Sequence, residues 1–456
     1  MPSTRDIVVT LLQNIGSRRE IERYLKEFSS VDRSRFAVIK VDGAVLQGQL
    51  DELGAALSFL HTIGLCPVVL HGAGPQIRQA LAEQSPDSAV GDGLHATTSE
   101  TLSIVRRVFR QVNLELASAL EQRGTPVRPI TAGVFEAEPV ARAERGLVGA
   151  VRAVHLDAVH AAIAAGQVPI LTPLGETAGG QILDVDADVA TRALAHAIQP
   201  SKVVLLTRSG GLRDGRERLI EAINLVEDYD DLSAETWFDG DMRRTLTGIA
   251  ELLAGLPASS SVSITSPDRL VRELFTHRGA GTFIRQGEAV RSFDRFEDTE
   301  TDRLRALIEH AFARPLSDDY FARKLPHRIY LVDSYRAAAI ITREGVTPYL
   351  DKFAVTRAAQ GAGLGASLWR RIRGDYPTLF WRSRSDNPIN PWYFANADGS
   401  VRRPPWIVFW YGVEGFIAIE ECVGLALAMS PTLGTGGLAE DRSPAAATAI
   451  HKEGQP

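Results

Sequence analysis

The sequence predicts an α/β fold in two parts, a doubly wound parallel sheet followed by a smaller α+β domain. Short apolar runs typical of buried strands alternate with amphipathic helical stretches, which predicts parallel βαβ units with helices on both faces of the sheet. Near Gly287 the pattern changes to shorter strands and a glycine-rich loop. At 456 residues the chain is long enough for more than one core.

The first sheet is expected from five apolar runs and the helical stretches that separate them. The predicted strands cover residues 36–41, 67–71, 127–131, 169–173 and 202–207, and the predicted helices cover residues 50–63, 100–123 and 158–165. Sheets of this kind bind ligands at the carboxyl ends of their strands. The loops at that edge are therefore the first place to look for a site.

Four segments follow from these patterns. Residues 1–34 are expected to form N-terminal helices, 35–288 the doubly wound domain, and 289–430 the α+β domain. Residues 431–456 contain few large side chains and are expected to be a disordered tail.

Composition excludes several classes of protein. A formal net charge of -6 gives no reason to expect nucleic acid or an anionic membrane as partner. Cys66 and Cys422 both lie in apolar runs, which favours buried reduced thiols over a disulfide or a metal site. The most apolar region, 406–429, contains three glutamates and is not expected to cross a membrane. The N-terminus has no secretory-signal pattern, so a cytoplasmic protein is expected.

A glycine-rich turn is the first candidate for chemistry. Gln360, Gly361, Gly363 and Gly365 lie between a predicted strand and a predicted helix. Glycines let the backbone approach a pyrophosphate closely, and the amide groups at a helix N-terminus favour an anion. A simple tight turn between a strand and a helix is the alternative.

This turn resembles the acyl-CoA-binding motif Q/R-x-x-G-x-G/A of the GNAT acetyltransferase superfamily, which Gln360, Gly363 and Gly365 match. The resemblance implies acetyl-CoA as cosubstrate. It also implies that the preceding strand, with Phe353 and Val355, offers backbone groups to the acetyl carbonyl and the pantetheine arm.

Longer motifs narrow the resemblance. The segments LDKF at 350–353, FWRSR at 380–384, NPINPWYF at 387–394 and FWYG at 409–412 resemble the acetyltransferase domain of N-acetylglutamate synthases of the vertebrate-like type. That group includes bifunctional bacterial synthase/kinases. The resemblance implies acetyl transfer to the α-amino group of L-glutamate, the first step of arginine biosynthesis, by a homo-oligomer.

The residue types suit a dicarboxylic substrate. Lys352, Arg382 and Arg384 supply positive charge near the glycine turn, and arginine can hold a carboxylate with two parallel hydrogen bonds. By resemblance, Lys352, Arg384 and Asn387 hold the amino acid. A solvated basic edge is the alternative, because Arg382 and Arg384 share one face of a predicted strand.

By the same resemblance, Tyr393 lies near the thioester sulfur. A phenol with a pKa near ~10 stays protonated at neutral pH and can donate to a departing thiolate with a pKa near ~8.5. The amine would then attack the thioester directly, without a covalent enzyme intermediate. A core position for Tyr393 is the alternative. The sequence does not identify the general base.

The first domain resembles acetylglutamate kinases of the amino-acid kinase family. Lys40 matches the lysine that faces the transferred phosphoryl group, and Gly72 and Gly74 match the glycine loop. Asp42 stands where that family has a second glycine, and its charge repels ATP phosphates.

Other departures fall on the expected acetylglutamate site. His95 replaces an arginine that grips a carboxylate, and Asp184 and Asp186 replace two asparagines, whereas Asp188 keeps the organising aspartate. These changes predict a degenerate kinase, with ATP and Mg²⁺ as ligands only if activity remains. A helix N-terminus is the alternative explanation for the three aspartates.

A third resemblance concerns regulation. Glu273, Gly279 and Gly281 match the arginine-binding signature of arginine-sensitive acetylglutamate kinases, in which the glutamate meets the guanidinium group. This implies arginine as an allosteric effector; an ordinary helix end followed by a glycine turn is the alternative. Two other functions stay open, namely a bifunctional synthase/kinase and a non-catalytic arginine sensor.

Overall fold

The computed structural model describes residues 36–84, 97–140, 146–257, 259–275, 280–356, 359 and 363–434. The predicted N-terminal helices and most of the predicted tail lie outside the described residues. The chain divides into two compact units at the bond between Gly287 and Glu288, and each unit is described here by itself. No described helix has the length and apolar character needed to cross a membrane.

The first unit is built on an eight-stranded sheet with the order β10-β12-β11-β9-β1-β2-β6-β3. All neighbours are parallel except β11 and β12. The strands are β1 (Ala37–Val41), β2 (Val68–His71), β3 (Val127–Ile130), β6 (Val168–Leu171), β9 (Lys202–Leu206), β10 (Ala222–Asn224), β11 (Ser261–Thr265) and β12 (Thr282–Arg285).

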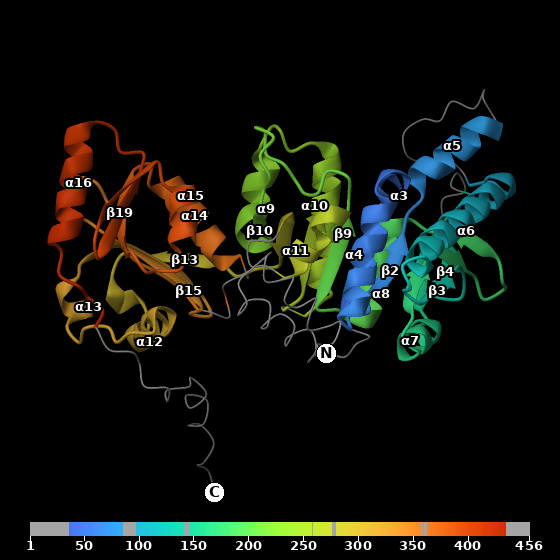
Figure 1. Cartoon of the computed structure of the whole chain (residues 1–456), viewed down its shortest axis with the longest axis horizontal. Coiled ribbons are helices and arrows are strands. Elements are labelled where there is room, and N and C mark those ends of the chain that lie inside the picture. Colours follow the sequence, from blue (N-terminus) through green and yellow to red (C-terminus); the bar gives the residue numbers. More distant parts are fainter. Residues whose placement is uncertain are drawn as a thin grey trace, which may run out of the picture. The chain divides into compact units, whose positions relative to one another are not determined.

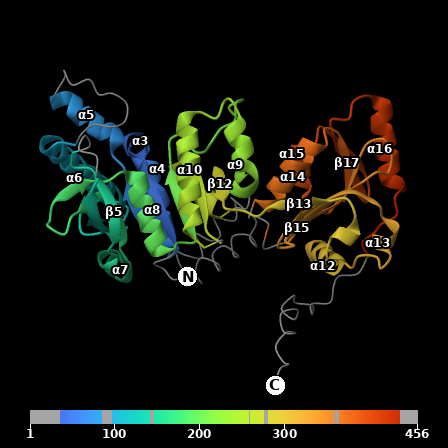
Figure 2. The same cartoon turned by 180° about the vertical axis from the view of Figure 1, so that it is seen from behind.

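Helices cover both faces of this sheet (Figures 1 and 2). Along β9, Val204 and Leu206 join the core cluster that contains α4, whereas Val203 and Leu205 join the cluster that contains α10. The helices are α3 (Gly43–Gly48), α4 (Leu50–Thr62), α5 (Gly74–Gln84), α6 (Ser99–Glu121), α7 (Asp157–Ala164), α8 (Ala187–Ile198), α9 (Leu225–Ala234), α10 (Gly240–Ala254) and α11 (Leu270–Phe275), with a 3₁₀ turn at Pro267–Arg269.

A second, four-stranded sheet completes the first unit. Its order is β5-β4-β7-β8, with β4 (Phe135–Pro139), β5 (Gly149–Val154), β7 (Leu174–Glu176) and β8 (Ile182–Asp184). The sequence patterns did not reveal these strands, because most have one face turned to solvent or are only three residues long. The five buried strands and three helices predicted for this unit are confirmed to within two residues at their ends.

The second unit contains a seven-stranded sheet with the order β13-β14-β15-β16-β17-β19-β18. All neighbours are antiparallel except β16 and β17, which are parallel. The strands are β13 (Val290–Phe293), β14 (Pro326–Val332), β15 (Ala337–Thr342), β16 (Tyr349–Val355), β17 (Leu379–Arg384), β18 (Gly399–Arg403) and β19 (Trp406–Tyr411).

Its helices also lie on both faces. One face carries the aromatic core beneath α14 (Leu364–Asp375) and α15 (Asn390–Asn396). The other carries α12 (Thr301–Phe312), α13 (Tyr320–Arg323) and α16 (Phe416–Ala428), with a 3₁₀ turn at Phe296–Asp298. Figure 1 shows α16 across β19 from α14 and α15. The predicted fold class, a doubly wound domain followed by an α+β domain, is confirmed.

The described part of the second unit includes the first residues of the predicted tail. Residues 431–434 were assigned to the tail, yet the Gly434 amide donates to the carbonyl of Pro315 (2.9 Å), and Leu433 forms a β-bridge with Leu316. Backbone hydrogen bonds to a segment far away in the sequence hold these residues. A prediction from amino-acid composition cannot detect such long-range contacts.

Candidate active site

The parallel strands β16 and β17 separate soon after they begin. Their ladder consists of one pair, Tyr349 opposite Phe380. Beyond it, the rest of β16 pairs with β15 and the rest of β17 pairs with β19. The strands therefore diverge toward their carboxyl ends, where parallel strands present ligand sites.

The glycine turn starts α14 at this divergence. Gly363 precedes the helix with φ of 74°, in the left-handed region that favours glycine. The first hydrogen bond into the helix runs from the Ser367 amide to the Gly363 carbonyl (3.0 Å), so the amides of the first turn have no acceptor within the helix. Gly365 lies against β16, since a Cβ there would be 3.5 Å from Val355 Cγ2. Gln360 and Gly361 lie outside the described residues.

Aromatic side chains form the floor beneath this turn. Phe353 stacks on Trp392 with 5.6 Å between ring centroids and meets Trp369 edge-on at 5.8 Å. The indole Nε1 atoms of Trp369 and Trp381 are buried and have no hydrogen-bond partner in the structure. This wall is apolar apart from those donors, which suits the thioester and pantetheine parts of an acyl-CoA.

A β-bulge places Lys352 on the opposite face of the sheet. Ile340 pairs with Lys352 and Ile341 with Leu350, so Asp351 is an extra residue in β16. Asp351 and Lys352 consequently both reach Tyr320, one by a hydrogen bond from its hydroxyl (2.7 Å) and the other over its ring (4.8 Å).

Lys352 is enclosed by protein groups. Its ammonium donates to Asp351 Oδ2 (2.6 Å) and to Thr432 Oγ1 (2.7 Å). Burial lowers the pKa of Lys352 below its ordinary value, whereas the charge of Asp351 opposes that change. Lys324 and Glu344 form a second ion pair beside Asp351. The two lysines and two carboxylates therefore balance in charge.

Side chains two residues apart lie on the same face of a strand, so both arginines of β17 lie on the same face of the sheet as Phe380 and its partner Tyr349. Lys352 lies on this face too. Arg382 donates to the carbonyls of Ala426 (2.6 Å), Met429 (2.8 Å) and Ser430 (3.2 Å), and its guanidinium stacks 4.2 Å from the Trp406 ring centroid. It thus caps the end of α16. Arg384 donates from Nε to Asp386, an exposed carboxylate, at 3.2 Å.

The loop after β17 carries two asparagines with different surroundings. Asn387 is partly buried and accepts from the Ile389 amide through Oδ1 (3.3 Å). Asn390, which the sequence analysis did not single out, is buried and donates to the Arg384 carbonyl (2.7 Å). It ties α15 to the end of β17. The second asparagine of the NPIN segment was the feature of the sequence that could have pointed to this residue.

Tyr393 lies on α15 within the aromatic core. Its ring contacts Trp381, Trp392 and Phe409, each at 5.5–5.6 Å between centroids. Burial raises the pKa of its hydroxyl above the ordinary value. Its hydroxyl has no hydrogen bond to another described residue. The phenol is therefore protonated at neutral pH, with its proton not committed to a protein acceptor.

The site thus has two sides. The glycine turn and Tyr393 belong to the face beneath α14 and α15, and the three cations belong to the face of α12 and α16. The divergence of β16 and β17 lies between them. Such an arrangement can receive an acyl-CoA on one side and an amine that carries carboxylate groups on the other.

In the first unit, Lys40 at the end of β1 is neutralised by acidic neighbours. Its ammonium lies 2.5 Å from Asp188 and 3.3 Å from Asp42. Burial acts to lower the pKa of Lys40, but the two carboxylates outweigh it and raise the pKa. Lys40 is thus a cation whose charge is already compensated by two carboxylates.

The loops around Lys40 keep the backbone features of the predicted glycine loop. The Gly72 amide donates to the Val41 carbonyl (2.9 Å), and Gly74 is the first residue of α5. Gly43 approaches this loop so closely that a Cβ would lie 2.9 Å from Ala73 Cα. The close backbone packing of the glycine loop is preserved, although the charge of Lys40 is neutralised.

The aspartates after β8 have separate roles. Asp186 caps α8 by accepting from the amides of Asp188 (2.9 Å) and Val189 (3.0 Å). Burial, with a contribution from Asp186, raises the pKa of Asp184 to about 6. A group with a raised acid pKa makes the fold less stable as pH rises from about 4 to 6. His95 lies outside the described residues.

Glu273 is buried at the end of α11 and accepts the Ala280 amide through Oε2 (2.6 Å). Gly281 follows, where a Cβ would lie 2.1 Å from the Ile264 carbonyl oxygen, so no larger residue fits. Gly279 lies outside the described residues.

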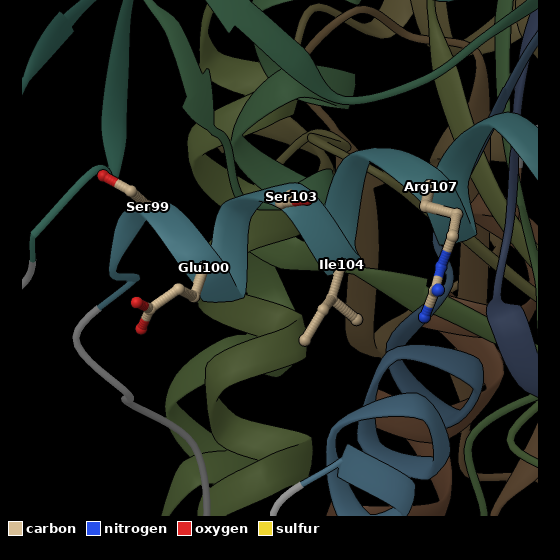
Figure 3. Close-up of a pocket in the computed structure, with 5 residues that line it drawn as sticks. All are labelled: Ser99, Glu100, Ser103, Ile104 and Arg107. Carbon is tan, nitrogen blue, oxygen red and sulfur yellow. The ribbon is translucent and has the colours of Figure 1, made fainter.

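A hollow of about 410 Å³ opens at the start of α6. Figure 3 shows its lining, which consists of Ser99, Glu100, Ser103, Ile104 and Arg107. It contains none of the residues predicted for the acetyl-transfer, kinase-like or arginine sites. We assign no function to it.

The fold, together with the protein families that it matches, defines the class: an N-acetyltransferase domain joined to an amino-acid kinase domain. Residues 288–427 match the N-acetyltransferase domain of N-acetylglutamate synthase, and residues 35–258 match the amino-acid kinase family. The chain belongs to the family that combines these two domains, the N-acetylglutamate synthases with an amino-acid kinase domain, and it is an amino-acid N-acetyltransferase.

Three relatives illustrate the range of this family. The chain is 46% identical to an acetylglutamate kinase of Xanthomonas campestris pv. campestris, with 92% of this chain and 100% of the relative covered. It is 35% identical to the mitochondrial N-acetylglutamate synthase of Homo sapiens, with 90% and 75% covered. A solved N-acetylglutamate synthase from Neisseria gonorrhoeae, complexed with coenzyme A and N-acetyl-glutamate, shares the fold with a TM-score of 0.56, 21% identity and coverage of 86% and 97%.

Proposed function

We propose that this protein transfers the acetyl group of acetyl-CoA to the α-amino group of L-glutamate, the first step of arginine biosynthesis. The observation that carries the proposal is the pair of unlike faces at the β16–β17 divergence. One face offers a helix N-terminus and a protonated tyrosine, and the other offers cations suited to carboxylates.

On the acyl-CoA side, the first-turn amides of α14 would meet the pyrophosphate, and Phe353 and Val355 would border the pantetheine arm. The backbone of β16, the strand that diverges from β17, would orient the thioester carbonyl. Gly363 supports this approach, because it takes the left-handed conformation immediately before the helix begins.

On the amino-acid side, Arg384 is the cation best placed to bind a substrate carboxylate. Among the described residues its side chain pairs with the exposed Asp386, and an exposed ion pair is weak and easily exchanged. Arg382 and Lys352 are engaged with carbonyls and with Asp351, so we assign them to the electrostatics and shape of this pocket. Asn387 completes the predicted set.

For the chemistry, the neutral amine would attack the thioester carbonyl carbon, forming the C–N bond as the C–S bond breaks. The Tyr393 hydroxyl would give its proton to the departing thiolate. Its raised pKa keeps that proton available throughout the neutral range. The substrate ammonium loses one proton to solvent before the attack. The second proton, released from the nitrogen as the amide forms, returns to the Tyr393 oxygen by way of solvent.

We propose that the first unit is a degenerate kinase with a regulatory role, and that the chain forms homo-oligomers. The neutralised Lys40 supports the loss of phosphoryl transfer, which depends on positive charge at the phosphates. The buried Glu273 carboxylate beside Gly281 supports arginine as the effector. The relative named acetylglutamate kinase favours a second candidate, a bifunctional synthase/kinase that uses ATP and Mg²⁺.

The test is coenzyme A release from acetyl-CoA, measured with L-glutamate and with L-glutamine. Loss of one carboxylate leaves a cation of the pocket without its partner, a penalty of roughly 1–3 kcal/mol. We expect kcat/KM for glutamate to exceed that for glutamine by at least about 10-fold. Equal values for the two amino acids would exclude glutamate as the specific acceptor.

A further inference from the structure

The segment that follows α16 reaches back to the amino-acid side of the site. Residues 430–434 are held by the Ser317 amide, which donates to the Thr432 carbonyl (3.0 Å), and by the bridge between Leu316 and Leu433. The match to the N-acetyltransferase domain ends at residue 427. These residues therefore lie outside the matched segment.

Lys352 has no donor left for a substrate. An ammonium group carries three N–H donors. Those of Lys352 go to Asp351 Oδ2 (2.6 Å), the Asp351 carbonyl (3.3 Å) and Thr432 Oγ1 (2.7 Å). With its side chain only 5% exposed, Lys352 is closed off from direct contact with a carboxylate.

The Thr432 hydroxyl is the outward end of this chain of contacts. Because it accepts from the ammonium, its own proton must point elsewhere. Thr432 is half-buried, and no other described residue accepts that proton. Two residues earlier, the Ser430 carbonyl receives Arg382. The segment thus binds both a lysine and an arginine of the amino-acid side.

We propose that Thr432 is an additional substrate-binding residue, which donates its hydroxyl proton to a carboxylate of the acceptor amino acid. Lys352 polarises that hydroxyl and acts on the substrate through it. The proposal rests on the proposed function, because it presupposes a carboxylate on this face of the sheet. It assigns to a position outside the matched domain a part in selecting an acidic amino acid.

The experiment compares Thr432→Val with Thr432→Ser in the full chain. Valine keeps the shape and removes the hydroxyl, so KM for glutamate should rise roughly 10-fold or more. KM for acetyl-CoA should stay within about twofold, and serine should restore the wild-type KM for glutamate. If valine fails to give folded protein, Thr432→Cys serves as a second variant that lacks the hydroxyl.

A matched control separates binding from folding. Thr299→Val removes a hydroxyl that donates to the Phe296 carbonyl (2.8 Å) elsewhere in the same unit, and it should leave both Michaelis constants unchanged. An unchanged KM for glutamate in Thr432→Val would overturn the proposal, as would equal rises for both substrates. A wild-type enzyme that does not prefer glutamate would instead reject the proposed function.

Discussion

At the scale of single residues, Tyr393 combines two properties seldom found together in a core tyrosine. Its ring packs against three aromatic neighbours, yet its hydroxyl has no hydrogen bond to another described residue. Buried tyrosine hydroxyls usually have a partner. Tyr411, in the same core cluster, follows that rule and donates to the Tyr376 carbonyl at 3.0 Å. The contrast favours a ligand-directed role for Tyr393 over the core-only alternative.

We predict that Tyr393→Phe lowers kcat by roughly 10²-fold or more with little change in KM for acetyl-CoA, because the lost proton donor acts in the transition state. Steady-state kinetics at pH 7–9 measure both constants. Tyr411→Phe is the matched control and should cost about 1 kcal/mol of stability with kcat preserved. Unchanged kcat in Tyr393→Phe would return this residue to a packing role.

At the scale of elements, Gly363 sets the backbone conformation at the start of α14, where we propose that acetyl-CoA binds. Gly363 is in the left-handed region, where a side chain costs roughly 1–2 kcal/mol. Near its other end, α14 contains Gly374, around which a Cβ would meet nothing within 4 Å. Replacing each glycine by alanine therefore distinguishes an effect of the Gly363 backbone conformation from an effect of any glycine-to-alanine change in the helix.

We predict that Gly363→Ala raises KM for acetyl-CoA roughly 10-fold, since a strained turn displaces the first-turn amides. Gly374→Ala should leave that constant unchanged and be neutral or stabilising by up to ~1 kcal/mol. Acetyl-CoA titrations and thermal melts of both variants provide the measurement. A Gly363→Ala enzyme with wild-type affinity for acetyl-CoA would show that the turn does not bind it.

At the scale of the whole molecule, the two units differ in how they treat their cations. In the second unit, Arg384 is paired only with an exposed carboxylate. In the first unit, Lys40 is paired with Asp42 and Asp188. The two arginines near the start of α10 also have partners nearby in the sequence: Arg243 donates to the Ser233 carbonyl (2.9 Å), and Arg244 pairs with Asp241. The positive charge that phosphoryl transfer requires is therefore already neutralised by neighbouring protein groups.

We predict that ATP-dependent phosphorylation of N-acetylglutamate is at background, while acetyl transfer persists in the same preparation. Acetylglutamyl phosphate, trapped with hydroxylamine, gives the first rate, and coenzyme A release gives the second. Asp42→Gly restores the glycine expected at that position and tests whether Lys40 can be freed. Comparable phosphorylation and acetylation rates in the wild type would establish the bifunctional alternative.

The buried strands and the principal helices of the first unit could be predicted from the amino-acid sequence, because apolar periodicity is a local property. The sequence also singled out candidate cations on β16 and β17. It did not determine what those cations contact. The bulge at Asp351 depends on pairing with β15. The Ala426 carbonyl that accepts from Arg382 lies 44 positions away, and the Thr432 hydroxyl that accepts from Lys352 lies 80 positions away. Such contacts depend on strand register and helix docking, which the tertiary structure alone decides.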